Sequence, residues 1–444
     1  MVGIPDKLWK AILYFFYLLI FFLLFLFCEK SPSPLLSGQV RLTAEEVGVT
    51  EVWLGVQTAH IIGEFSLKVW RDDTCIFRGV FSGADTTVYD SRLRPAHRYR
   101  YRARLERNGH PVLESAPLEI TTMDTTSHEF TWEIIEIPSP YGSGVLYDVA
   151  IIDENDIWAV GEIYADSIQP WLPYNAVHWV GQRWELKRIK TNACGGVDYP
   201  PIEAIFAFAA NDILFAHIDG SITHFNGISF VNDCRLITEL NGSVKKMWGK
   251  SRNDLYVVSG NGFIAHYDGS RWQKLESGTE LPIQDIWGAR NEKTGEYEIL
   301  CVASDKYHNL GKKILRIKED TTYPIPDAGL SWSLSSIWFI SNSRYYVAGN
   351  GIFEKRRLTD PFWKNKPGDF TPYYTFKIRG YALNNIWATG GFGEVLHFNG
   401  NSWRSFFNST HLAGGNYYSL DLTENMVIVV GYNSPNAVIA IGKP

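Results

Sequence analysis

Apolar residues follow two different patterns along the 444-residue chain. Near the N-terminus they form one unbroken run from Ala11 to Phe27. Beyond Val40 they occur instead in short blocks or in alternation with polar residues, and Gly, Asn, Asp and Ser separate the blocks. Short apolar blocks bounded by turn residues predict many β-strands joined by tight turns.

Some of these blocks recur almost residue for residue. The copies begin at Asn211-Asp212-Ile213-Leu214, Asn253-Asp254-Leu255-Tyr256 and Asn384-Asn385-Ile386-Trp387. In each copy a His follows 13 positions after the first Asn, and an Asn-Gly or Asp-Gly pair and an aromatic residue come next. A fourth copy begins at Asn155 and carries ten additional residues before its His. A repeated all-β unit of roughly 40 residues predicts a β-propeller.

Each repeat is interpreted as four strands, and degenerate copies begin near Ile283, Ser336 and Tyr417. The last copy lacks an outer strand, whereas the apolar segment 130–137 precedes the first copy without a repeat of its own. We expect this early strand to complete the last blade, which closes the ring and removes free sheet edges. The count is then seven blades within residues 128–444, with six or eight as alternatives if one degenerate copy is misassigned.

Two features of the repeat predict local structure. An Asn-Gly or Asp-Gly pair between the third and fourth strands favours a tight hairpin in which both turn residues take positive φ. The recurrent histidines stand at equivalent positions, so a ring would hold them far apart. We therefore expect structural roles beside the turn, and no metal site, for His178, His224, His266 and His397.

Residues 38–123 predict a separate β-sandwich. Alternating strands occur in 51–56 and 65–70, and Leu93-Arg94-Pro95 precedes the strand that begins at Tyr99. This segment resembles a fibronectin type III domain, which implies that Tyr99 forms the tyrosine corner and Trp53 the core tryptophan. The alternating arginines from Arg98 to Arg104 are interpreted as one solvated strand face, and the domain as a spacer.

The N-terminal pattern is that of an export signal: Lys7 and Lys10 precede the apolar run, and polar residues follow it. Two interpretations remain. Residues 1–28 are either a lipoprotein signal peptide that ends at the lipidated Cys28, or an uncleaved membrane anchor, for which 17 apolar residues is the lower limit. Residues 29–37 form a linker. Both interpretations predict a membrane-tethered protein of the bacterial cell envelope, on the surface or in the periplasm.

Composition limits the partners. The net charge is −6 and no long basic run occurs, so nucleic acid is not an expected ligand. In an oxidising compartment Cys194 and Cys234, which follow the outer strands of neighbouring repeats, could form a disulfide; two free thiols are the alternative. Cys75 and Cys301 are predicted to be buried apolar residues.

The repeat resembles bacterial secreted propellers of the kelch or BNR type. Asn155-Asp156-Ile157-Trp158-Ala159-Val160-Gly161 is the best match to their blade signature, and the Asn-Gly-x-x-Trp hairpin is similar to a relaxed Asp-box. In those families the Asp-box is a structural device, so the resemblance implies a fold and no activity.

Candidate chemistry is sparse. Asp148, Glu203 and Asp285 fall on first strands near the predicted channel, where a glycosidase would need facing carboxylates. Aromatic residues in long loops, Trp171, Trp363 and Tyr373, would suit ligand recognition, with packing on a neighbouring blade as the alternative.

We therefore predict an all-β chain: a fibronectin type III-like sandwich followed by a seven-bladed β-propeller. The expected function is non-catalytic binding of a protein or glycan by a monomer without cofactors. The alternatives are a carbohydrate-active hydrolase or lyase that uses the channel carboxylates, and a purely structural surface protein.

Overall fold

The computed structural model describes residues 38–61, 63–82, 85–191, 194–195, 198–240, 242–366 and 371–444. The predicted signal peptide or anchor, Cys28 and the linker lie outside these ranges. The described residues form 36 strands and two single-turn helices, α2 (Ile237–Leu240) and α3 (Phe407–Thr410). The prediction of an all-β chain is confirmed. The strands divide into two compact units, β1 to β8 and β9 to β36.

The first unit consists of two antiparallel sheets. One has the order β1 (Gln39–Val47), β2 (Glu51–Ala59), β5 (Thr86–Ser91). The other has the order β4 (Thr74–Phe81), β3 (Phe65–Arg71), β6 (Arg98–Arg107), β7 (His110–Glu114), and β8 (Leu118–Thr121) also pairs with β6. Alternate side chains of β2, β3 and β6 are fully buried, among them Leu54, Val69 and Tyr101, and they form the core of this unit.

Two expectations for this unit can be compared with the structure. Trp53 is not a core residue: it alternates with the buried Val52 and Leu54, and its ring lies 4.4 Å from that of Tyr89. The resemblance therefore assigned the tryptophan to the wrong face of β2. Arg98, Arg102 and Arg104 of β6 pair with carboxylates of neighbouring strands, as in Arg104 with Glu114 at 3.1 Å.

The second unit contains seven four-stranded antiparallel sheets among the described residues. The first four sheets are β10 (Val145–Asp153), β11 (Asp156–Ile163), β12 (Tyr174–Trp179), β13 (Trp184–Lys187); β14 (Ile202–Ala209), β15 (Asp212–His217), β16 (Ile222–Phe225), β17 (Phe230–Asp233); β18 (Val244–Ser251), β19 (Asp254–Ser259), β20 (Ile264–Tyr267), β21 (Trp272–Leu275); and β22 (Ile283–Arg290), β23 (Tyr297–Ser304), β24 (Lys312–Lys318), β25 (Thr321–Ile325).

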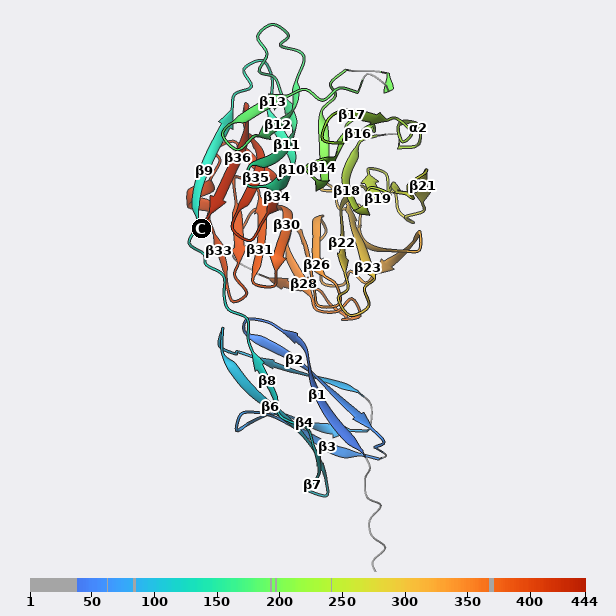
Figure 1. Cartoon of the computed structure of the whole chain (residues 1–444), viewed down its shortest axis with the longest axis vertical. Helices are drawn as coiled ribbons and strands as arrows, with labels where there is room; N and C mark the ends of the chain where they lie inside the picture. The colour runs from blue at the N-terminus through green and yellow to red at the C-terminus, as the bar shows by residue number, and fades with distance from the viewer. Residues whose placement is uncertain are drawn as a thin grey trace, which may run out of the picture. The chain divides into compact units, whose positions relative to one another are not determined.

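The remaining three sheets are β26 (Leu334–Ile340), β27 (Arg344–Gly349), β28 (Gly351–Lys355), β29 (Lys364–Lys366); β30 (Thr375–Ala382), β31 (Asn385–Gly390), β32 (Val395–Phe398), β33 (Trp403–Ser405); and β34 (Gly415–Leu422), β35 (Val427–Asn433), β36 (Asn436–Lys443), β9 (Thr131–Ile137). The first strand of each sheet contacts the first strand of the next, and β34 contacts β10, so the sheets close into a propeller-like ring. Figure 1 shows these inner strands around the middle of the unit.

The ring is closed by strands from opposite ends of the chain. β9 pairs with β36 from Ile137↔Ala437 to Thr131↔Lys443, and Figure 1 shows the two strands side by side. Between the last sheet and the first, the aliphatic side chains of β10 and β11 pack on those of β35 and β36, including Leu146, Ile157 and Ile428. Burial of this apolar surface holds the closure together, at roughly 25 cal/mol per Å² removed from water.

The recurring His and Asp form one contact in each of three sheets. In each contact the His Nε2 lies close to the Asp Oδ1. The distance is 2.8 Å for His178 and Asp156, 2.7 Å for His224 and Asp212, and 3.1 Å for His266 and Asp254. In the copy that begins at Asn384, Asn385 replaces the Asp, and the Nδ1 of His397 instead lies 2.9 Å from the Nδ1 of His128. Each of these histidines is held by neighbouring side chains of its own unit.

The hairpin prediction was only half right. The glycine takes positive φ in all four copies, for example 87° at Gly227, but the preceding Asn or Asp does not. Instead the Asn226 Oδ1 accepts the backbone N–H groups of Ile228 and Ser229, which makes a four-residue turn. A Cβ on Gly227 would lie 2.7 Å from the Cβ of Asn211, so close packing also requires glycine. This packing links the Asn and the Gly of each repeat.

Candidate functional site: the cavity at the start of the inner strands

Every inner strand has a β-bulge at the same place, near its first residue. In β10, for example, Leu146 pairs with Gly161 and Asp148 with Val160, which leaves Tyr147 without a partner in the ladder. The bulged residues are Tyr147, Glu203, Lys245, Gln284, Ser335, Phe376 and Tyr418. A bulge redirects a side chain, and all seven of these residues line one cavity of about 270 Å³.

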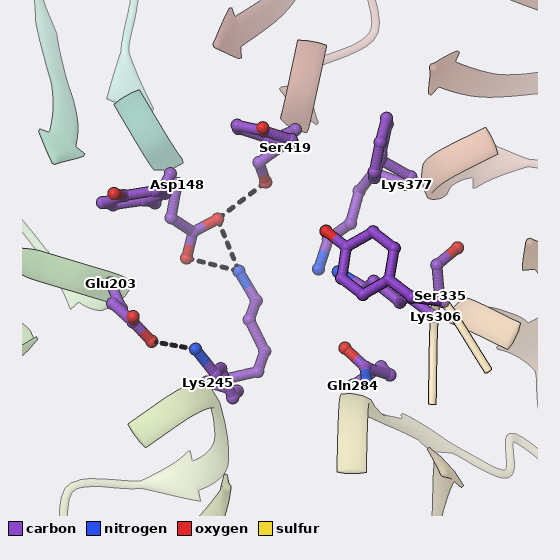
Figure 2. A pocket seen from close by; sticks show the side chains of 13 residues that line it. Asp148, Glu203, Lys245, Gln284, Lys306, Ser335, Lys377 and Ser419 are labelled. Carbon is purple, nitrogen blue, oxygen red and sulfur yellow. Dashed lines mark hydrogen bonds and ion pairs between the residues drawn. The ribbon is translucent and has the colours of Figure 1, made fainter. Parts of the chain in front are cut away.

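The residues that follow the bulges form a second layer: Asp148, Ala204, Lys246, Asp285, Ser336, Lys377 and Ser419. Four of them also line the cavity, together with Lys306 and Tyr307 from the β23–β24 loop. Figure 2 shows charged and polar side chains from different strands pointing into this space.

Asp148 is buried beneath the cavity and fully bonded. Its carboxylate accepts hydrogen bonds from the Lys246 Nζ at 2.5 and 2.7 Å, from the Ser419 Oγ at 2.7 Å and from the Ile205 N–H at 3.0 Å. Burial opposes ionisation, but the ammonium groups of Lys246 and Lys377 outweigh it and lower the pKa of Asp148. A general acid would need the opposite shift.

Asp285 occupies the equivalent position in the fourth sheet, but it does not line the cavity. Arg379 donates to both of its oxygens at 2.9 Å, Lys377 donates at 2.9 Å and the Ser336 Oγ donates at 2.6 Å. Burial again opposes ionisation, and Arg379 and Lys377 overcome it and hold the pKa of Asp285 well below its ordinary value. The carboxylate is closed off from any ligand and acts as a buried structural anion.

Glu203, the third candidate carboxylate, lies at the rim and pairs with Lys245 at 2.7 Å. The structure thus brings Asp148 and Glu203 to one cavity and excludes Asp285 from it. Each of the two carboxylates that line the cavity already has a lysine partner, and this arrangement resembles neither of the free carboxylate pairs used by glycosidases.

Aromatic side chains form part of the rim. The rings of Phe376 and Tyr418 lie 5.1 Å apart, those of Tyr374 and Phe376 5.0 Å apart, and those of Tyr147 and Tyr418 6.4 Å apart. Tyr307, beside the cavity, is 82% exposed. Aromatic rings next to fixed charges are typical of binding surfaces.

Strand direction determines which loops surround the cavity. In a four-stranded antiparallel sheet, the start of the first strand and the connection between the second and third strands lie at the same edge. We call this edge of the ring the pocket face. Its connections carry large exposed apolar residues: Tyr141, Ile168, Trp171, Ile218, Tyr307, Leu310, Trp332 and Phe392.

The three loop aromatics predicted from the sequence differ in outcome. Trp171 is 73% exposed in the β11–β12 connection, on the pocket face. Tyr373 is partly exposed, and its ring lies 5.1 Å from that of Phe392. Trp363 is buried, and its Nε1 donates to the Pro326 carbonyl at 3.0 Å, so it supports a loop and cannot meet a ligand. For this residue the structure therefore agrees with the packing alternative.

The sequence did not reveal Lys306, Tyr307 or Phe392. Lys306 and Tyr307 belong to a degenerate repeat, where no signature marks the loop. The uneven apolar content of the connections between second and third strands was the one signal that could have identified them.

Cysteines and membrane-spanning elements complete the description. Cys194 and Cys234 form a disulfide between the β13–β14 and β17–β18 connections, also on the pocket face. Within the described ranges, no cluster of three or more His, Cys, Asp or Glu side chains could hold a metal ion. No helix among the described residues is long and apolar enough to cross a bilayer.

Comparisons with known proteins identify the fold alone. No protein-family model and no curated protein sequence matches the chain. The structure of YCF48 bound to D1 peptide matches with a TM-score of 0.52 and 16% identity over 70% of this chain and 97% of that chain. YCF48 from Cyanidioschyzon merolae matches with a TM-score of 0.51 and 15% identity over 70% and 98% of the two chains. The WD40 β-propeller domain of Doa1 has a TM-score of 0.49 and 12% identity over 71% and 98%.

Proposed function

We propose that this chain is a recognition protein whose propeller binds a peptide segment of a partner protein on the pocket face. The observation that carries the proposal is the coincidence of the cavity and the exposed aromatic loops on one edge of the ring. Large exposed apolar side chains on the same edge as a polar cavity are characteristic of protein-binding surfaces. A protein of similar fold has been solved with a peptide bound, which is consistent with such a role.

The proposal includes the architecture around this surface. Each four-stranded sheet is one blade of a seven-bladed ring, and the first unit is a fibronectin type III-like spacer. Its two sheets, ordered β1-β2-β5 and β4-β3-β6-β7, support that assignment. Residues 1–28 export and tether the chain in the cell envelope. The disulfide supports an oxidising compartment, where such bonds persist.

Recognition accounts for the cavity better than catalysis does. Asp148 and Glu203 are each neutralised by a lysine within 2.7 Å, and the lowered pKa of Asp148 is unsuited to proton donation. The same groups are well suited to binding, because fixed and mutually oriented charges lose little entropy when a ligand arrives.

An array of random decapeptides probed with the full chain in detergent tests this function. The double variant Trp171→Ser/Tyr307→Ser removes two exposed side chains of the pocket face. The matched control, Ile228→Ser/Tyr297→Ser, removes exposed side chains from other parts of the second unit. We expect wild type and control to bind the same peptides and the pocket-face variant to lose them. Absence of peptide binding, or binding only to polysaccharides on a parallel glycan array, would contradict the proposal.

A further inference from the structure

The cavity has more positive than negative charge. Lys245, Lys246, Lys306, Lys377 and Arg379 line it or belong to the Asp285 cluster beneath it, and they supply five positive charges. Asp148, Glu203 and Asp285 supply three negative charges. When all five groups are protonated, the positive charges outnumber the negative charges by two, although the whole chain has a net charge of −6. The excess is therefore local to this site.

Lys306 is the clearest part of that excess. Its ammonium group forms no ion pair or hydrogen bond with any described residue, and its nearest recorded partner is the Phe376 ring, with 5.7 Å from Nζ to the centroid. Figure 2 shows Lys306 and Lys377 approaching the cavity from different sheets. Burial, followed by repulsion from Lys245, lowers the pKa of Lys306 to about 8. A nearby anion would relieve both effects.

The donors that remain available favour a small anion. Arg379, which would suit a phosphate, directs both terminal nitrogens to Asp285 and also donates to the Ile337 and Ile378 carbonyls. The donor groups of the Arg379 guanidinium are therefore already occupied. The donor that remains available for a ligand is the ammonium group of Lys306, with other lysines nearby, in a cavity of about 270 Å³. This volume lies just below the range of about 300–1,000 Å³ that is usual for small-molecule pockets.

We infer that this cavity binds a carboxylate of the peptide that docks on the pocket face, with Lys306 as the primary contact and the Tyr147, Phe376 and Tyr418 rings around the stem that carries it. This inference rests on the proposed function and specifies its ligand chemistry. The carboxylate comes either from an acidic side chain or from the C-terminus of the partner, and both present the same group to Lys306.

A small probe tests the carboxylate site directly. 3-Phenylpropionate and its uncharged analogue 3-phenylpropionamide are titrated into the full chain and followed by ligand-observed NMR. We expect the acid to bind and the amide not to bind. Lys306→Met should weaken binding of the acid about tenfold or more, as expected for loss of a hydrogen bond to a charged group. Lys293→Met is the matched control, because it changes the net charge equally in the β22–β23 connection at the opposite edge of the same sheet.

Matched peptides then separate the two possible sources. Each array peptide is made with Glu or Gln at one position, and with a free or an amidated C-terminus. Tighter binding of the Glu peptide than of the Gln peptide indicates a side-chain carboxylate, and tighter binding of the free acid than of the amide indicates a C-terminus. Loss of the observed preference in Lys306→Met supports the inference. Peptides that bind equally well without any carboxylate would overturn the inference and leave the proposed function standing. If 3-phenylpropionate binds but no peptide does, the carboxylate does not come from a peptide. That outcome would overturn both the inference and the proposed function.

Discussion

Asp148 and Asp285 stand at the same position of two inner strands, immediately after the bulge, yet they serve different regions of the ring. Each accepts a backbone N–H of the following sheet, Ile205 or Ile337. Each also pairs with a lysine two sheets further on, Lys246 or Lys377. The repeat therefore encodes the same contact between sheets twice.

The difference is a single added cation. Arg379 binds both oxygens of Asp285 and closes that region, whereas no arginine reaches Asp148 among the described residues, and Asp148 remains at the base of the cavity. One repeated contact thus produces a closed structural cluster around Asp285 and an open site above Asp148.

The largest expected effect is the loss of the closed cluster. Asp285→Asn would leave Lys377 and Arg379 buried without an anion, which costs about 3–5 kcal/mol of unfolding free energy. Urea denaturation followed by tryptophan fluorescence measures it. Asp327→Asn is the control, because Asp327 forms only a surface pair with Lys312 at 3.9 Å, worth about 0–1 kcal/mol. Equal effects of the two substitutions would remove the distinction between a buried cluster and a surface pair.

Asp148→Asn should have a smaller effect, about 1–3 kcal/mol, because Lys246 lies beside the cavity and water can reach it. The same substitution removes a negative charge from the site, so we expect 3-phenylpropionate to bind more tightly. Calorimetric titration of the variant tests this second effect. Weaker binding would show that Asp148 positions the ligand rather than opposing it.

Carboxylate binding should depend on pH through Lys306, whose pKa is about 8 in the free protein. The protonated lysine binds the anion, so affinity should be highest below pH 7 and fall about tenfold by pH 9, as the protonated fraction falls. The charged groups that act on the pKa of Lys306 are Lys245, Asp285 and Glu203. Lys377 lines the same cavity, and burial lowers its pKa to about 7. Lys306→Met should remove the fall in affinity between pH 8 and pH 9, and persistence of that fall in the variant would assign it to another group, such as Lys377.

The smallest effect concerns acid stability. The folded pKa of Asp285 lies below the unfolded value of about 3.9, so its stabilisation is complete above that value and is lost as pH falls below it. The difference in unfolding free energy between wild type and Asp285→Asn should therefore shrink by about 1 kcal/mol between pH 7 and pH 3. A difference that stays constant over this range would mean that the carboxylate titrates normally in the folded chain.

Much of the fold could be predicted from the sequence because the repeat acts locally. The Asn-Asp start of the second strand, the His of the third and the glycine of the hairpin contact one another within each sheet, so their spacing recurs. The pairing of β9 with β36 follows from an unpaired early strand and an incomplete last repeat.

The site was harder to predict because its contacts join different repeats. The bulges that turn Tyr147 and Lys245 into the cavity have no signature in the residues themselves. The Asp285–Arg379 pair spans sheets 94 positions apart in the chain. The neighbours of Trp363 in the sequence left ligand recognition and packing both open, and its burial against the Pro326 loop decides for packing.

Hydrogen–deuterium exchange of the full chain, with and without the array peptide that binds most tightly, tests the central claim most directly. The account predicts slower exchange in connection 305–311, which contributes Lys306 and Tyr307 to the cavity, and in connection 391–394 on the same pocket face. It predicts no change in the connections 291–296 and 341–343, at the opposite edge of the ring. Slower exchange that is confined to the edge opposite the pocket face, or to the outer strands, would contradict the account.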